Sequence, residues 1–238
     1  MENESAVPPL QSRILYQCEE CVVINKIKGE AVEGARGGME NLPLKLRVLL
    51  DGNVRIVEPV HRLDVPVTGC VLFALTRQSL SFLNAAFAAE SKPPPVKKLY
   101  WAIVEKPSFF LPESGELVHR LETNAGKNKS LAYNEDKPGG KKASLLYRIT
   151  GEGKNYLFVE VELLSGRHHQ IRAQFAAIGL HIKGDLKYGA RRSEKGGGIR
   201  LHARSLEFPD PLNKGERICV TADPPEMDNL WYDFSTKQ

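Results

Sequence analysis

The segment HRLDVPVTG, residues 61–69, lies between two apolar runs, residues 54–57 and 70–75, that both predict β-strands. Its proline and glycine interrupt regular structure, so we expect a loop held between the two strands. Loops anchored on rigid elements often display reactive side chains. This one carries an imidazole, a guanidinium and a carboxylate: His61, Arg62 and Asp64. Taken alone, the segment is more typical of a solvated turn in which the aspartate caps local backbone.

A second segment, LLSGRHHQIR at residues 163–172, adds five more polar side chains after its own turn. The Ser-Gly turn joins a predicted strand to a helix predicted over residues 168–178. His168 and Arg172 are four residues apart and therefore share one flank of that helix. The buried face of the helix should consist of Ile171, Phe175 and Ile178.

Alternating and apolar patterns predict strands through most of the remaining chain. These are residues 14–16, 21–26, 98–105, 143–149, 156–164, 200–208 and 217–222. Helices are expected over residues 42–50 and 77–90, the second capped by Thr76, and a long polar connection over residues 107–141. Many strands, few helices and no regular βαβ alternation predict an α+β fold with a largely antiparallel mixed sheet, flanked by helices and loops.

Tyr100 lies in the predicted strand 98–105, on the opposite face from Trp101, because successive side chains of a strand alternate. It faces either a cleft or the core of a two-sided sheet, and the pattern favours neither.

The 238 residues, with a net charge of +4, are enough for one sizeable core. We expect a disordered tail over residues 1–12, a single domain over 13–222 and a loosely packed tail over 223–238. The chain has no apolar run of about 18 residues and no secretory signal pattern, so a cytoplasmic protein without membrane contact is expected. Lysines and arginines gather in segments rich in Gly, Pro or Asn, which favours a polyanionic partner.

The four cysteines predict neither a zinc site nor a disulfide framework. Cys18 and Cys21 form a lone C-x-x-C pair whose role stays open. Cys70 and Cys219 lie in apolar runs and are expected in the core. The glycine-rich stretch at residues 34–38 is too irregular for a phosphate-binding loop.

Five motifs follow one another along the chain: HRLD with its Thr-Gly, K-x-Y, SGRxHQIR, GDxxYG and LHA, within residues 61–69, 98–100, 163–172, 184–189 and 201–203. Through them the chain resembles the RluA-type pseudouridine synthases over about residues 13–208. One HRLD would be weak evidence, whereas five ordered motifs at the expected spacings are specific. The family usually has Asn-Lys-Pro-x-Gly where this chain has NKIKG, residues 25–29, so the proline is missing. No S4 RNA-binding module is expected before the catalytic domain.

The resemblance implies an isomerase that turns specific uridines of structured RNA into pseudouridine. It assigns the essential carboxylate to Asp64, its ion-pairing partner to Arg167, and to Tyr100 the stacking under the base and acceptance of the C5 proton. A phosphate contact at a helix N-terminus is the alternative for Arg167. Further RNA contacts are expected from residues near these motifs: His61, Arg62, Lys98, His169 and Arg172.

The reaction involves no net oxidation or hydrolysis, so no cofactor and no metal are expected. The expected partner is ribosomal or transfer RNA, and we expect a monomer with no obligatory protein partner and no membrane. Whether Asp64 attacks C1′ or removes a proton from C2′ stays open. One alternative is an inactive RNA-binding protein of the same fold. Another is a hydrolase that uses Asp64 with His61 or His169.

Overall fold

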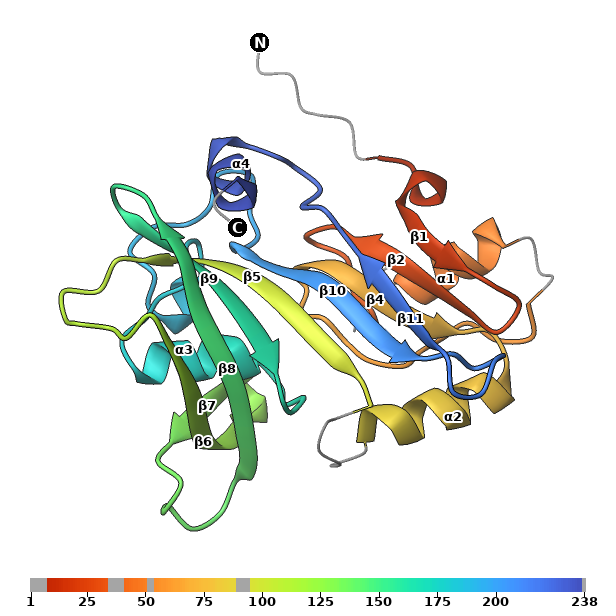
Figure 1. Cartoon of the computed structure of the whole chain (residues 1–238), viewed down its shortest axis with the longest axis horizontal. Coiled ribbons are helices and arrows are strands. Elements are labelled where there is room, and N and C mark those ends of the chain that lie inside the picture. The colour runs from red at the N-terminus through yellow and green to blue at the C-terminus, as the bar shows by residue number, and fades with distance from the viewer. Residues whose placement is uncertain (1–7, 34–40, 51–53, 89–94, 237–238) are drawn as a thin grey trace.

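The computed structural model of the chain describes residues 8–33, 41–50, 54–88 and 95–236. Within these residues one mixed sheet of eleven strands runs through the molecule, with its helices outside it (Figure 1). The strands are β1 Ile14–Gln17, β2 Cys21–Lys26, β3 Glu58–Pro59, β4 Thr68–Ala74, β5 Lys97–Glu105, β6 Ser114–Asn124, β7 Lys129–Tyr133, β8 Lys141–Glu152, β9 Tyr156–Leu163, β10 Leu201–Pro209 and β11 Arg217–Thr221. The helices are α1 Leu42–Leu49, α2 Arg77–Ala88, α3 Gln170–Ala177 and α4 Asn229–Ser235, with 3-10 turns η1 Leu10–Arg13, η2 Ala125–Lys127 and η3 Leu186–Tyr188.

Strand β10 lies at the centre of the sheet, whose order is β1-β2-β4-β10-β5-β9-β8-β6-β7. It pairs with β5 along one edge, and on the other edge first with β4 and then with β11. The β4–β10 pair is parallel, and every other named strand pair of the described chain is antiparallel. The expected α+β fold with a largely antiparallel mixed sheet is therefore confirmed.

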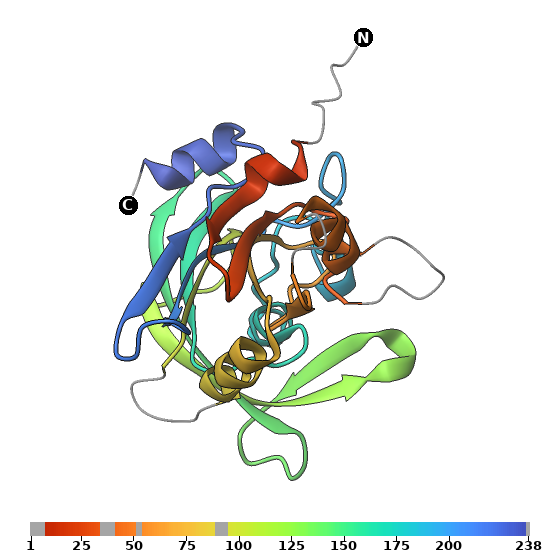
Figure 2. The same cartoon turned by 90° about the vertical axis from the view of Figure 1, so that its right-hand side faces the viewer.

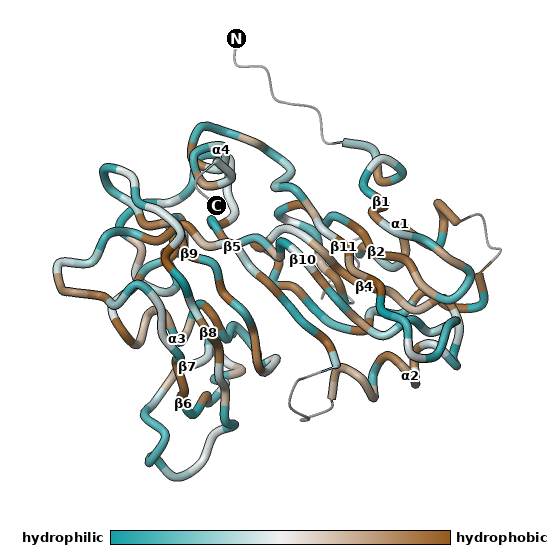
Figure 3. The backbone as a smooth tube through the Cα atoms, in the orientation of Figure 1, coloured by the Kyte–Doolittle hydropathy of each residue, from teal (hydrophilic) through white to brown (hydrophobic). Residues whose placement is uncertain are grey.

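The two faces of β5 pack against different parts of the chain, as strand alternation requires. Tyr100, Ala102 and Val104 belong to the main core, which also contains residues of the 61–69 loop and of α3. Trp101 and Ile103 pack on the other face against Trp231 and Phe234 of α4. In Figure 3 brown and teal stretches alternate along the strands, whereas the connection between β7 and β8 is mainly hydrophilic.

Several expected elements differ from the structure. Residues 54–57 are not a strand, and the short β3 follows them. The long connection expected over residues 107–141 contains β6 and β7, a hairpin that projects from the body (Figure 2). Sequence reasoning missed it because charged and polar residues interrupt the alternation on its exposed face.

The C-terminal segment and one cysteine also differ. The loose tail expected over residues 223–238 contains α4 within its described part, residues 223–236, and Trp231 and Phe234 of this helix are 5% and 0% exposed. Cys70 is buried as expected, whereas Cys219 is exposed. Residues 1–7 of the expected N-terminal tail, and the glycine-rich stretch at 34–38, lie outside the described residues. No helix in the described part of the chain is long and apolar enough to span a membrane.

We therefore expect Phe234 to contribute to the stability of the whole sheet, and not only to that of the C-terminal segment. Its ring lies 4.6 Å from that of Trp101 and 5.3 Å from that of Phe158, centroid to centroid. Phe234→Ala should lower the free energy of unfolding by about 3–5 kcal/mol, measured by urea denaturation, because it opens a cavity under β5. Tyr232→Ala, at a 62% exposed position of the same helix, is the control and should change it by no more than about 0.5 kcal/mol. Equal effects would contradict the packing role of α4.

Candidate active site

The loop that carries Asp64 is fixed through its backbone carbonyls. The buried ammonium of Lys26 donates to the carbonyls of Ile27, Val65 and Val67 at 3.0, 3.1 and 2.7 Å. The amide of Gly29 also donates to Val65, that of Ile199 to Pro66, and that of Val67 back to Asp64. Every carbonyl from residue 64 to residue 67 thus has a donor, as buried backbone requires.

Lys26 is charged although its side chain is fully buried. Burial lowers its pKa to about 8, while the charges of Glu30 and Asp64 act in the opposite direction. At neutral pH the ammonium therefore keeps its proton and remains a donor to the loop. The sequence placed this lysine at the end of an apolar strand but gave it no role.

The loop ends where β4 meets β10. Thr68 Oγ1 lies 2.8 Å from Nδ1 of His202, whose Nε2 lies 2.9 Å from the carbonyl of Ala222. Gly69 has a φ of +112°, and a Cβ there would overlap the backbone of Ala203. Only glycine permits this close approach, so the Thr-Gly pair of the motif sets the position of the loop on the sheet.

Helix α3 brings a guanidinium to Asp64. Nη1 of Arg172 donates to Oδ2 of Asp64 at 2.9 Å, while Nε and Nη2 donate to the two carboxylate oxygens of Asp185 at 2.7 and 2.8 Å. Burial acts to lower the pKa of Arg172, but the hydrogen bonds and charge of Asp185, and then Asp64, outweigh it and raise the pKa. The planar fork of arginine suits this double contact. Side-chain exposure is 5% for Arg172, 1% for Asp185 and 22% for Asp64, so only Asp64 opens to solvent.

Tyr100 belongs to the same face of the sheet as the loop. Its side chain is 7% exposed and lies in the main core with Leu63 and Val67. Burial raises its pKa, and the nearby charge of Asp64 raises it further. Its phenol is therefore neutral at pH 7.

The expected pair between Arg167 and Asp64 is wrong. Arg167 precedes α3 and donates from Nε to the carbonyl of Lys142 at 3.1 Å, on the exposed side of the turn. The pair was expected from the family resemblance alone, and in the structure α3 begins at Gln170 rather than residue 168. Arg172 then lies in its first turn, buried and directed at Asp64. Sequence reasoning had placed Arg172 among RNA contacts instead.

The other predicted contact residues fall into two groups. His61 and His169 are not surface cations, because burial lowers their pKa values to about 3 and about 4. His61 accepts from the amide of Leu72 and stacks on Phe87. Arg62 is exposed and paired with Glu33, and Lys98 lies with its ammonium 5.9 Å from the ring of Phe87.

Three residues of the site had no predicted role: Lys26, Asp185 and Tyr188. Asp185 and Tyr188 were visible only as letters of the GDxxYG motif. The Tyr188 hydroxyl lies 2.9 Å from Nδ1 of His169, and its ring lies under the Arg172 guanidinium at 4.9 Å.

The arrangement presents one carboxylate, that of Asp64, to solvent beside the buried ring of Tyr100. Among the described residues no group of three or more His, Cys, Asp or Glu side chains is placed to hold a metal ion. The Cys18 and Cys21 sulfurs are free and lie 3.7 Å apart. A carboxylate that is partly open to solvent, as Asp64 is, is able to act as a nucleophile or as a base.

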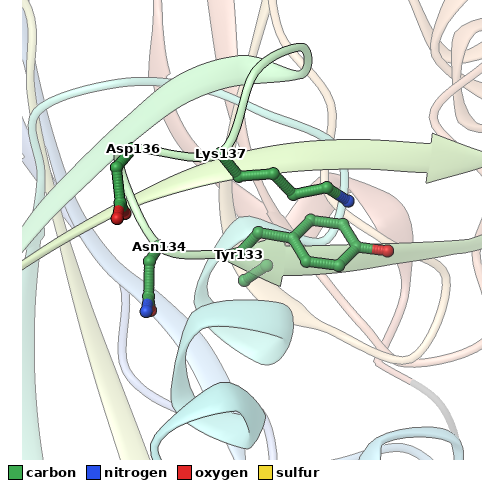
Figure 4. Close-up of a pocket in the computed structure, with 5 residues that line it drawn as sticks. Tyr133, Asn134, Asp136 and Lys137 are labelled. Carbon is green, nitrogen blue, oxygen red and sulfur yellow. The ribbon is translucent and has the colours of Figure 1, made fainter.

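A separate hollow of about 440 Å³ lies near the end of β7 (Figure 4). Its lining comprises Ala132, Tyr133, Asn134, Asp136 and Lys137. The Lys137 ammonium lies over the Tyr133 ring, 3.0 Å from its centroid. None of the motif residues lines this hollow, so it is distinct from the site around Asp64.

Comparison with known proteins identifies the family of this chain. A family model described as RNA pseudouridylate synthase matches residues 20–177. An uncharacterized RNA pseudouridine synthase of Zymomonas mobilis is 33% identical over 92% of this chain and 95% of its own length. The tRNA pseudouridine synthase C of Vibrio parahaemolyticus is 26% identical over 96% of both chains. Ribosomal large subunit pseudouridine synthase C of the same organism is 29% identical over 87% of this chain and 64% of its own.

The solved structure of human RNA pseudouridylate synthase domain containing 1 has the same fold, with a TM-score of 0.72 at 22% identity, covering 94% of this chain and 87% of that one. The eleven-stranded sheet of this chain therefore has the fold of that structure. The chain belongs to the RNA pseudouridylate synthase family. It is therefore an enzyme, an isomerase of uridine in RNA.

The buried histidines should make stability fall in mild acid. Burial lowers the pKa of His202 to about 4, below its unfolded value of roughly 6.5. The unfolded chain then binds more protons below pH 6.5, so stability is present above that pH and is lost as pH falls toward 4. For this group the loss at pH 5 is about 2 kcal/mol. His202→Gln should be less stable at pH 7.5 but lose less between pH 7.5 and 5, by urea denaturation at both pH values. A wild-type pH slope in the variant would contradict this.

Proposed function

We propose that this enzyme converts specific uridines of ribosomal or transfer RNA into pseudouridine through the carboxylate of Asp64. The bond from ribose C1′ to uracil N1 breaks, the base turns, and C1′ joins C5 as the C5 proton leaves. Asp64 acts beside the ribose, as carboxylates do at other glycosidic centres. The relatives named for ribosomal and for transfer RNA support both substrate classes.

The ion pair between Asp64 and Arg172 carries this proposal. A carboxylate in a closed base pocket loses solvation, which disfavours its charged form. Arg172 opposes that loss at 2.9 Å and is itself anchored by Asp185. Arg172 and His169 both approach Oδ2, so within the described residues Oδ1 is the oxygen left to face a ribose.

Tyr100 supplies the wall of the base pocket in this proposal. A flat, buried ring suits stacking with an unstacked base. Its neutral phenol already holds a proton, so it suits stacking better than acceptance of the C5 proton.

RNA must bring the target base out of its stack, which costs a few kcal/mol. The exposed pair of Arg62 with Glu33 is weak, as surface pairs are, so Arg62 is able to exchange it for RNA. Lys98 of β5 lies close enough to Arg167 for the charge of the arginine to help lower the pKa of the lysine, after burial. Both cations are proposed to bind phosphates that flank the target uridine. We propose that the enzyme works as a cytoplasmic monomer without an obligatory protein partner.

Asp64→Asn should abolish turnover while RNA binding stays within about two-fold, because the amide keeps the shape and loses the charge. Forming the C1′–C5 bond displaces the hydrogen at C5, so tritium release from 5-tritiated uridine in transcripts of ribosomal and transfer RNA measures the reaction. Asp233→Asn, an exposed substitution on α4, is the control and should behave as the wild type. Turnover by Asp64→Asn at a tenth of the wild-type rate or more would contradict the proposal. Release of free uracil would show a hydrolase instead.

Substitutions of Arg167 and Arg172 should have different effects on the reaction rate in the same assay. Arg172→Lys loses the fork that joins Asp64 to Asp185, so the single-turnover rate should fall roughly 10- to 100-fold. Arg167→Lys keeps a point charge for phosphate, and its rate at saturating RNA should stay within about three-fold. A larger loss at Arg167 than at Arg172 would restore the sequence-based assignment of the pair.

A further inference from the structure

His169 occupies a position that its packing alone does not require. It precedes α3 with a φ of 52°, and among the described non-glycine residues only Asn128 shares a positive φ. This left-handed conformation costs a non-glycine residue about 1 kcal/mol or more. The side chain is nevertheless buried, with its ring stacked on His168 at 3.8 Å between centroids.

The two ring nitrogens of His169 face two different groups. Nδ1 lies 2.9 Å from the Tyr188 hydroxyl, and Nε2 lies 3.6 Å from Oδ2 of Asp64. Tyr188 is itself fixed, because the amide of Ser130 donates to its hydroxyl oxygen at 2.8 Å. The histidine therefore connects a fixed hydroxyl to the carboxylate of the site.

The protonation state of His169 follows from its surroundings. Burial, opposed by the charge of Asp64 and supported by that of Arg172, lowers its pKa to about 4, so at pH 7 only one nitrogen carries a proton. If Nε2 carried no proton, its lone pair would face the carboxylate of Asp64 and be repelled by it. With the proton on Nε2, Nδ1 accepts from the Tyr188 hydroxyl, at a shorter distance than the 3.1 Å from that hydroxyl to the carbonyl of Ser130. Electrostatics and distance thus select the same tautomer.

We propose that His169 is a positioning residue of the isomerase: its neutral Nε2–H, held in that tautomer by Tyr188, donates to Oδ2 of Asp64. The separation of 3.6 Å is longer than a hydrogen bond, and it shortens when RNA closes the pocket, as bonds of free active sites do. With Arg172 on the same oxygen, the carboxylate is held so that Oδ1 faces the ribose. This role replaces the phosphate contact expected from the sequence, and it rests on the proposed role of Asp64.

Two substitutions of His169 distinguish positioning from folding. The amide nitrogen of Gln reaches the place of Nε2, whereas that of Asn reaches only the place of Nδ1. Asn tolerates the left-handed conformation better than Gln does. A purely structural histidine is therefore replaced better by Asn, and a donor to Asp64 is replaced better by Gln.

His169→Gln should keep the single-turnover rate within about three-fold of wild type, and His169→Asn should lose about ten-fold or more, the value of one hydrogen bond to a charged group. RNA dissociation constants should stay within about two-fold in both, because neither touches phosphate. Melting temperatures of both variants, without RNA, should follow the opposite order. A rate for His169→Asn equal to or above that of His169→Gln overturns the proposal, as does weakened RNA binding with an unchanged rate.

Tyr188→Phe provides a second test if His169→Asn fails to fold. Without the hydroxyl the tautomer is no longer fixed, so the single-turnover rate should fall several-fold with an unchanged dissociation constant. A wild-type rate overturns the proposal. If Asp64→Asn is inactive while these variants match the wild type, only the role of His169 fails. If Asp64→Asn is active, the proposed function fails first.

Discussion

The partly buried ion pair between Asp64 and Arg172 is the interaction on which the geometry of the candidate site depends. Burying such a pair is costly unless its remaining donors and acceptors are satisfied. Asp185 satisfies the other two donors of the guanidinium, and the ring of Tyr188 covers its face. Together with Lys26, which is electrostatically coupled to Asp64, the site contains two cations and two anions. Opposite charges thus face one another throughout the site, which offsets part of the cost of removing them from water.

Rigidity of the loop follows from the same lysine. The Lys26 ammonium donates to three backbone carbonyls, so it fixes the backbone of the loop rather than its side chains. The position of Asp64 therefore depends on β2, which carries Lys26, and on β4, which begins at Thr68. Both strands reach β10, by way of the parallel β4–β10 pair. The sheet thus places the carboxylate relative to Tyr100 on β5 before any RNA arrives. Such preorganisation reduces the reorganisation needed in the transition state.

Local patterns predicted most elements, because alternation and helical spacing depend on near neighbours. They predicted the α+β class, the strand that carries Tyr100 and the side of it opposite Trp101. They failed for features that depend on contacts between residues distant in the sequence. The left-handed His169 lies directly before α3, which begins at Gln170, two residues later than the pattern predicted. Asp64 and Arg172 are 108 residues apart in sequence, so a contact of Asp64 with this segment was accessible only through the family resemblance, and that resemblance assigned the pair to Arg167 instead.

The missing proline of the Asn-Lys-Pro-x-Gly segment has a physical replacement in this chain. Ile27 has the amide hydrogen that a proline lacks, and it donates to Oε2 of Glu30 at 3.2 Å. Glu30 also accepts two bonds from Arg13 of η1, at 2.7 and 3.0 Å, with both side chains largely buried. A proline ring would restrict the backbone at residue 27 itself. In this chain the ion pair of Glu30 with Arg13 holds the same backbone in place, through the hydrogen bond from the amide of Ile27. The Lys26 ammonium, which binds the carbonyl of Ile27, depends on this arrangement, and through it the Asp64 loop depends on a segment before the sheet begins.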